Sequence, residues 1–407
     1  MTVARENLDA LTGLRFVAAF TVVIGHSYRP LLEVSGIGMP LFFTLSGFII
    51  HYVYADAFAT GGWRRAAGEF AVARFSRLYP LYLLLLVWSL LRGPIGPPLV
   101  TTDGLPVLLA YFLCAWTWWP FMVEGHLLTT WYYHISWSVS SEIFFYVLYA
   151  LVIYRLSQIA NFRKCLTILV LFCIISYLTL YLIFYARDWW EAALLEHFPQ
   201  FKARNDDFAE SLYRWILYIS PYPRLFEFTG GVLTCQLYQL VRAQPALCAR
   251  IRSGWLAGLA LALIVVLFAM FRYLGEYEPW LAIGNHSWRA FLVNLHMNFL
   301  FAPACYLLIF SLALGGGAVG RALSSRWACF LGDISYSTYL SHPMAERILM
   351  HTGLVVTATA LHLLAVLAII YLMSWVLYST VEVPAKRWVR LLLTPRPQPV
   401  ASPASGN

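Results

Sequence analysis

Charged residues are scarce in this sequence. Asp, Glu, Lys and Arg together make up 12% of the 407 residues, whereas hydrophobic residues make up 60%. Soluble domains carry roughly 25% charged residues, and a chain this poor in charge cannot cover a soluble surface of its size. The composition therefore excludes a soluble globular domain and predicts an integral membrane protein. The 25 Tyr, 27 Phe and 16 Trp agree, because aromatic rings gather at membrane–water interfaces.

Cysteine motifs and basic runs are also missing. The seven cysteines are scattered and contain no C-x-x-C pair, which argues against a disulfide framework and a zinc site, so we expect no metal. No run of five or more basic residues occurs, and we expect no nucleic-acid partner. The formal charge of +8 is instead interpreted as a signal of membrane topology.

Ten apolar segments are long enough to cross a bilayer, which takes about 17–25 residues. We therefore predict an all-α, multi-pass fold. The segments are 9–29, 36–56, 77–92, 137–156, 164–186, 222–241, 254–274, 291–314, 328–349 and 355–381. The shorter segment 105–120 is flanked by prolines, and we expect it to be re-entrant or to lie along the outer interface.

The positions of basic residues predict the orientation. Cytoplasmic segments carry an excess of Lys and Arg, and if 105–120 does not cross, most basic residues face the cytoplasm, including the cluster from Arg155 to Lys164. Both termini are then cytoplasmic. The N-terminus lacks a cleavage pattern, so the first helix is expected to be retained. We predict one transmembrane domain over 1–390 and a disordered cytoplasmic tail over 391–407.

Five ionisable residues fall inside predicted membrane spans, where a charge is costly without a partner or water. They are Arg15, His26, Glu142, Glu227 and His342. Arg15 and His26 are eleven residues apart, which places them on one helix face about 16 Å apart along the axis. The other three are expected in the outer half with His26. A His beside a carboxylate suits general base catalysis, and Glu142 is the expected partner. The alternative is structural hydrogen bonding between helices.

Two arginines precede the third predicted span. Arg74 and Arg77 are three residues apart and share a helix face, so together they could hold phosphate groups through bidentate hydrogen bonds. The alternative is contact with anionic lipid, which juxtamembrane arginines make routinely.

Six blocks of residues occur in order along the chain. They are Arg15 and His26 with ten residues between them, Pro40-Leu-Phe-Phe-Thr-Leu-Ser46-Gly47-Phe48, Arg74-Phe-Ser-Arg77, Trp137-Ser138-Val-Ser-Ser-Glu142, Arg224-Leu-Phe-Glu227, and the segment from Ser335-Tyr336 to His342. In kind and order these blocks resemble the motifs of the acyltransferase-3 family of membrane proteins, and the resemblance extends from about residue 7 to 390.

The resemblance implies a function and a role for each motif. It implies an acyl-CoA donor, by default acetyl-CoA, with no bound cofactor. The acceptor would be a hydroxyl of an extracytoplasmic or lipid-linked sugar, such as an exopolysaccharide unit. His26 would be catalytic with Glu142, while Arg15, Arg74, Arg77 and Ser46 would bind or position the donor. Supporting roles fall to Trp137, Ser138, Arg224, Glu227, Tyr336 and His342. The expected location is the bacterial inner membrane, and the oligomeric state stays open.

Several alternatives remain at this point. A transporter or flippase for a glycan would also need buried charges, although no symmetric pair of broken helices is visible. An acyltransferase acting on a small secondary metabolite would share the same motifs. His51 and Asp56 match the His-x4-Asp spacing of glycerolipid acyltransferases, but no matching Pro-Glu-Gly segment follows, and we interpret the spacing as coincidence. A structural or receptor role is the remaining alternative.

Overall fold

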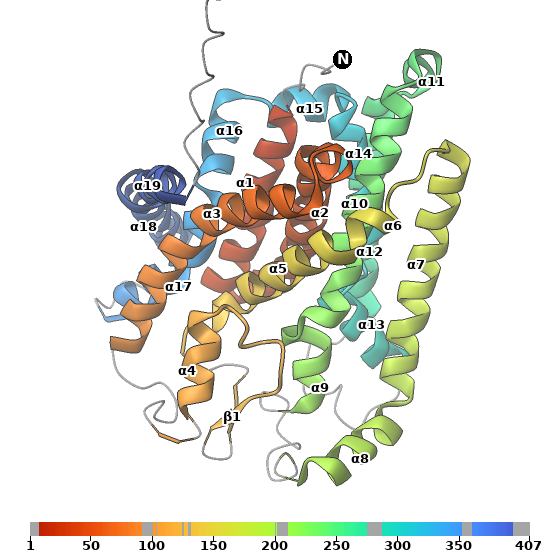
Figure 1. Ribbon diagram of the computed structural model, residues 1–407. Coiled ribbons are helices and arrows are strands. Elements are labelled where there is room, and N and C mark those ends of the chain that lie inside the picture. Colours follow the sequence, from red (N-terminus) through yellow and green to blue (C-terminus); the bar gives the residue numbers. More distant parts are fainter. Residues whose placement is uncertain are drawn as a thin grey trace, which may run out of the picture.

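The computed structural model is a bundle of helices with one very small sheet (Figure 1). It describes residues 8–91, 101–102, 104–123, 126–128, 132–199, 201, 211–274, 287–351 and 360–393. Much of the predicted tail 391–407 lies outside the described residues, although the last helix continues through Leu393. The expected all-α class is confirmed, because the only strands among these residues are Met122–Val123 (β1) and His126–Leu127 (β2), paired antiparallel.

The helices vary widely in length. The first half of the chain contains α1 Asp9–Ser27, α2 Ser35–Thr60, α3 Trp63–Leu91, α4 Gly104–Phe112, α5 Trp137–Leu148, α6 Tyr154–Leu156, α7 Phe162–Tyr185, α8 Arg187–His197, and the short 3-10 helices Arg29–Val34 and His134–Ser136. The second half contains α9 Leu212–Arg214, α10 Pro221–Arg242, α11 Pro245–Arg250, α12 Ser253–Leu274, α13 Trp288–Met297, α14 Ala302–Ala313, α15 Gly317–Leu323, α16 Arg326–Asp333, α17 Ser335–His351, α18 Ala360–Leu377 and α19 Val383–Leu393. In the described part of the chain, π-helical turns lie at Tyr149–Ile153, Trp215–Ile219 and Tyr378–Glu382.

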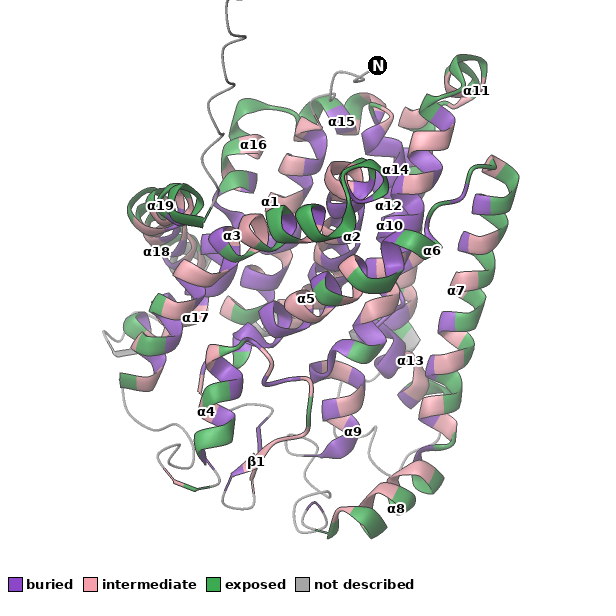
Figure 2. Cartoon of the chain, viewed as in Figure 1, coloured by how far each residue is buried: buried purple, intermediate pink, exposed green. Residues whose placement is uncertain are grey.

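Seven helical stretches in the described part of the chain are long and apolar enough to cross a membrane, or eight if the bent pair α14–α15 is one span. They include α1, α3, α7 and α12. The outward face of α7 carries exposed Val170, Ile174 and Leu178, as lipid contact requires (Figure 2). These helices make the chain a membrane protein, and the count of ten crossings stays a prediction.

Three predicted spans differ from the helices found. Segment 291–314 is divided into α13 and α14 around residues 298–301, because Pro303 lacks a backbone N–H and suits the first turn of a new helix. Segment 328–349 is divided into α16 and α17. The span predicted at 222–241 corresponds to α10, which is long enough to cross but more polar than the seven. Within 105–120, α4 has only nine residues, too few to cross alone.

The centre of the bundle is the contact between α2 and α10, the most extensive helix–helix contact in the structure. The two backbones approach closely because each supplies a glycine. A Cβ on Gly47 would lie 2.0 Å from the carbonyl oxygen of Phe228, and one on Gly231 would lie 2.1 Å from that of Thr44. Small residues of this kind allow tight helix packing inside membranes. α1 packs on α2, α16 and α17, so the N-terminal helix is held within this centre.

Candidate functional site: an arginine-lined cavity and a histidine pair

The cavity of about 170 Å³ lies between α1, α2, α3, α5 and α17. We call it the arginine cavity, because Arg15, Arg74 and Arg77 all line it. Seven of the twelve residues predicted to form the site lie in its wall: Arg15, Ser46, Arg74, Arg77, Ser138, Glu142 and Tyr336. The motifs from α1, α2, α3, α5 and α17 are therefore brought to one place by the fold.

The guanidinium of Arg74 is held in a position in which it can bind an anion in this cavity. Its guanidinium lies over the ring of Tyr54, 5.2 Å from the centroid, and donates a hydrogen bond of 3.2 Å to the hydroxyl of that tyrosine. Its Nε is buried and has no partner among the described residues. A buried donor without a partner carries a desolvation cost, so an anionic ligand that accepts from this nitrogen gains binding energy. Arg77, one turn further on, lines the same cavity.

Glu142 belongs to the arginine cavity and is not the partner of His26. Its Oε1 accepts hydrogen bonds from Ser46 at 2.7 Å and from Tyr146 at 2.5 Å. It also acts electrostatically on Arg15 and Arg74. The expected His26–Glu142 pair is therefore corrected: Glu142 is a countercharge among arginines. Tyr146 was missed in the sequence, although its position four residues after Glu142 places both on one helix face.

His26 instead pairs with His342 of α17. Nδ1 of His26 lies 2.9 Å from Nε2 of His342, and Nδ1 of His342 lies 2.7 Å from the carbonyl oxygen of Tyr339. His342 is fully buried, whereas His26 is exposed. The buried histidine is thus hydrogen-bonded to the accessible one. His26 lies in the last turn of α1, whereas Arg15 lies nearer its start.

The two hydrogen bonds show which ring nitrogens carry hydrogen when both histidines are neutral. A carbonyl oxygen only accepts, so Nδ1 of His342 carries a hydrogen and its Nε2 is an acceptor. Nδ1 of His26 must then donate to that Nε2, which leaves Nε2 of His26 with a lone pair. Pro343 contributes to this arrangement, because a proline inside a helix removes the N–H that would otherwise bond to the carbonyl of Tyr339.

Two further ionisable residues near the histidine pair, His134 and Glu346, were not identified from the sequence. His134 is exposed and lies between Tyr133 and Ile135, which are hydrogen-bonded to Leu340 and Tyr339 of α17. It is within electrostatic range of His26 and His342. Glu346, one turn after His342, accepts a hydrogen bond of 2.7 Å from Ser27. The carboxylate bonded to the residue next to His26 is therefore Glu346.

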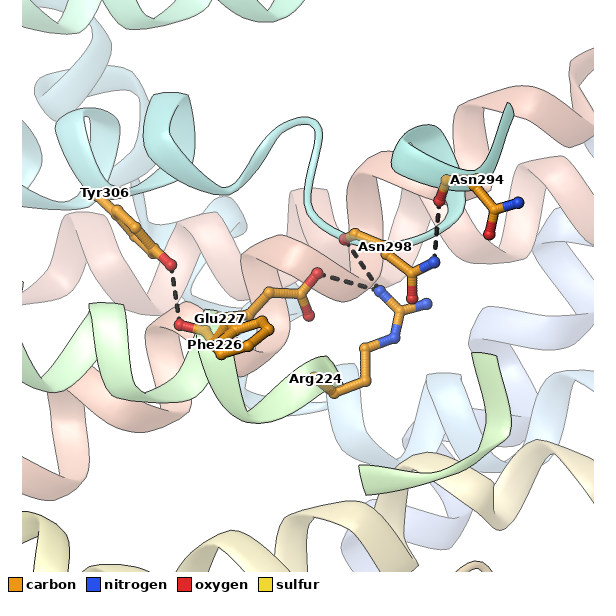
Figure 3. A network of polar contacts seen from close by, with 6 residues as sticks. All are labelled: Arg224, Phe226, Glu227, Asn294, Asn298 and Tyr306. Carbon is orange, nitrogen blue, oxygen red and sulfur yellow. Dashed lines mark hydrogen bonds and ion pairs between the residues drawn. The ribbon is translucent and has the colours of Figure 1, made fainter. Parts of the chain in front are cut away.

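Two of the predicted supporting residues, Arg224 and Glu227, belong to a buried network with Asn294 and Asn298 (Figure 3). Nη1 of Arg224 is 3.0 Å from Oε1 of Glu227 and donates a bond of 3.0 Å to the carbonyl oxygen of Asn298, at the break between α13 and α14. Asn298 in turn donates to the carbonyl of Asn294. The guanidinium lies 5.4 Å from the ring centroid of Trp137. Among the described residues, Glu227 is thus bonded to Arg224 and not to either histidine, and the expected outer layer shared with His26 stays a prediction.

The competing motif of His51 and Asp56 is not arranged for catalysis. His51 is fully buried, and its two ring nitrogens are bonded to Tyr149 at 3.1 Å and to Gln236 at 2.9 Å. Neither nitrogen is available as a base, which agrees with the interpretation of the spacing as coincidence. In the described part of the chain, no group of three or more His, Cys, Asp or Glu side chains could hold a metal ion.

Fold and site together define a helical membrane protein whose first helix contributes Arg15 to an arginine-lined cavity and carries the accessible His26. Residues 8–379 match the family model described as "Acyltransferase domain" of the acyltransferase-3 type. The chain belongs to this acyltransferase family. Membership favours the enzyme over the transporter or flippase considered from the sequence.

One curated relative is similar over part of the chain. It is "Protein 2 in picA locus" of Rhizobium radiobacter, 32% identical over 112 residues, which are 27% of this chain and 48% of the relative. The match thus covers about half of that protein's length. No solved structure matches the chain.

Proposed function

We propose that this protein is an O-acyltransferase that moves an acyl group, by default acetyl, from acyl-CoA to a hydroxyl of a sugar or glycan. The donor phosphates bind at Arg74 and Arg77 on the cytoplasmic side of a bacterial inner membrane. The acceptor, an extracytoplasmic or lipid-linked sugar such as an exopolysaccharide unit, binds beside His26. The observation that supports this most is that one helix joins the arginine cavity to the histidine pair.

The distance between these two regions suits the donor. Arg15 lines the cavity, and His26 lies eleven residues further along α1, about 16 Å along the axis. A pantetheine arm is a flexible chain that can reach over such a distance while the nucleotide phosphates stay at the cavity. Arg15 then lies beside the arm, and Ser46 and Glu142 lie in the wall that the arm passes.

His26 acts as the general base in this mechanism. Its Nε2 takes the proton of the acceptor hydroxyl, and the hydroxyl oxygen attacks the thioester carbonyl. The C–S bond breaks, the new ester keeps the acyl group, and the CoA thiolate leaves and takes up the proton. His342 is a positioning residue, because it orients the ring of His26 and shares the positive charge that forms on it.

The first experiment measures label transfer from radiolabelled acetyl-CoA into extracted glycan, by membranes that carry either wild type or His26→Ala. We expect label in glycan with wild type only. Near-normal transfer by the variant contradicts the role of His26. Total glycan and a small-molecule fraction are compared as acceptors, because they separate a glycan acceptor from a secondary metabolite. Label retained on the wild-type protein without acceptor would identify an acyl-histidine route.

A further inference from the structure

The start of α19 is fixed next to Arg77 by two hydrogen bonds from α17. Tyr336 donates to the carbonyl oxygen of Leu78 at 2.6 Å, and the neighbouring Ser337 donates to Oε2 of Glu382 at 2.7 Å. Leu78 follows Arg77 directly, and Glu382 is the last residue of the π-helical turn before α19. α19 packs along α3. A helix from the far end of the sequence is thus attached to the edge of the arginine cavity.

One face of α19 extends the positive charge of this cavity. Glu382, Lys386 and Arg390 are spaced by four residues and so follow one another along one face. Lys386 is partly buried and within electrostatic range of Arg77, Arg390, Glu382 and Arg15. Arg390 is exposed one turn further out. The cations therefore continue outward from Arg77, along a helix that sequence motifs had not singled out.

Cations outnumber carboxylates at this edge. Glu382 is bonded to Ser337 and lies within electrostatic range of Arg15, Arg77 and Lys386, so this one carboxylate faces three cations. Glu142 is bonded to Ser46 and Tyr146. Like charges held close together are unfavourable unless an anion lies between them. Anionic lipid would contact basic side chains that point outward, such as Arg387, but Lys386 is partly buried on the side of Arg77. This arrangement favours an anion that lies across α3 and α19 together.

We infer that Lys386 and Arg390 bind the 3′-phosphate of the acyl-CoA donor, while Arg74 and Arg77 hold its diphosphate. The inference rests on the proposed function. Acyl-CoA carries two separate phosphate groups, a diphosphate in the chain and a monophosphate on the ribose, and each needs cationic partners of its own. One turn of α19, about 6 Å, separates Lys386 from Arg390, so both can contact a single phosphate from two sides.

The test compares acetyl-CoA with 3′-dephospho-acetyl-CoA as donors for the full-length protein in detergent. Wild type is expected to show a KM for the dephospho donor higher by roughly tenfold. Lys386→Ala is expected to raise the KM for acetyl-CoA by a similar factor, with kcat and the KM for the dephospho donor little changed. Arg390→Ala is expected to act in the same direction, and Lys386→Arg to restore the difference between the donors.

Arg387→Ala is the matched control, because it removes the same charge from the same helix on a neighbouring, exposed face. It is expected to leave both KM values unchanged. A rise in KM for both donors with Lys386→Ala and Arg390→Ala contradicts the assignment to the 3′-phosphate. Unchanged KM values for both variants also contradict it and assign this face to anionic lipid. If wild type uses neither donor, the proposed function fails; if it uses both equally well, only the present inference fails.

Discussion

Nε2 of His342 lies 2.9 Å from Nδ1 of His26, and this contact decides which nitrogen of the exposed histidine can take up a proton. Because Nδ1 of His342 faces the carbonyl of Tyr339, Nε2 of His26 is the nitrogen left as base. Among the described residues, no carboxylate is hydrogen-bonded to either ring. In the proposed mechanism, the charge formed during transfer would be shared between two imidazoles, one accessible and one buried.

Replacing His342 by Ala should lower kcat and leave the KM for the donor unchanged, because the arginine cavity does not include this residue. We expect a loss of at least about tenfold, smaller than the roughly 10²–10⁴-fold loss expected when the base His26 is removed. Steady-state transfer measurements with varied acetyl-CoA give both parameters. A change confined to KM would mean that His342 contacts the donor.

Pro343→Ala should make the protein more stable and less active. The alanine removes a proline that costs a helix interior about 3 kcal/mol. Its new N–H can bond to the carbonyl of Tyr339 and so competes with His342. Losing a hydrogen bond worth roughly 0.5–1.5 kcal/mol corresponds to a two- to tenfold lower kcat. Thermal unfolding in detergent and initial rates are measured on the same preparation, and full activity would show that the bond of His342 does not need the proline.

The sequence predicted the residues of the site better than their partners. Arg15, Ser46, Arg74 and Arg77, which the sequence assigned together to the donor, line one cavity, and Glu142, which the sequence placed with His26, lines it as well. The depth of a residue in the membrane, however, does not tell which neighbouring helix its side chain faces. Glu142 and His342 were therefore placed in one layer with His26, although only the second contacts it.

The helices were predicted less well where polar residues interrupt them. Periodicity and hydropathy identified α1, α2, α7 and α12, which are continuous and apolar. The break between α13 and α14 depends on Asn298, whose carbonyl accepts from Arg224 of a distant helix. The turn between α14 and α15, bent by 82°, depends on Gly315, Gly316 and Gly317, all with positive φ. A hydropathy average does not detect such local causes.

Arg224 and Glu227 should be more important for stability than for chemistry. Both are fully buried and 3.0 Å apart, and they connect α10 to the break between α13 and α14. Removing one partner of a buried ion pair costs about 3–5 kcal/mol. Glu227→Gln and Arg224→Met should each lower the unfolding temperature in detergent. The double variant Arg224→Met/Glu227→Gln should lose less stability than the sum of the two single variants, and strict additivity would contradict an interaction between the two residues.

Gly231→Ala should separate the two central helices. The added Cβ would lie 2.1 Å from the carbonyl oxygen of Thr44, and a backbone atom cannot move without its helix. Overpacking of this kind typically costs about 1–3 kcal/mol, so we expect a lower unfolding temperature and less monodisperse protein by size-exclusion chromatography.

Gly68→Ala provides the control for this substitution. Gly68 lies in α3 with nothing within 4 Å of the added Cβ, and alanine is the better helix former by up to about 1 kcal/mol. The same chemical change should therefore stabilise the protein at one position and destabilise it at the other. If the two variants behaved alike, the tight contact of α2 with α10 would not limit stability, and Gly47 and Gly231 would need another explanation.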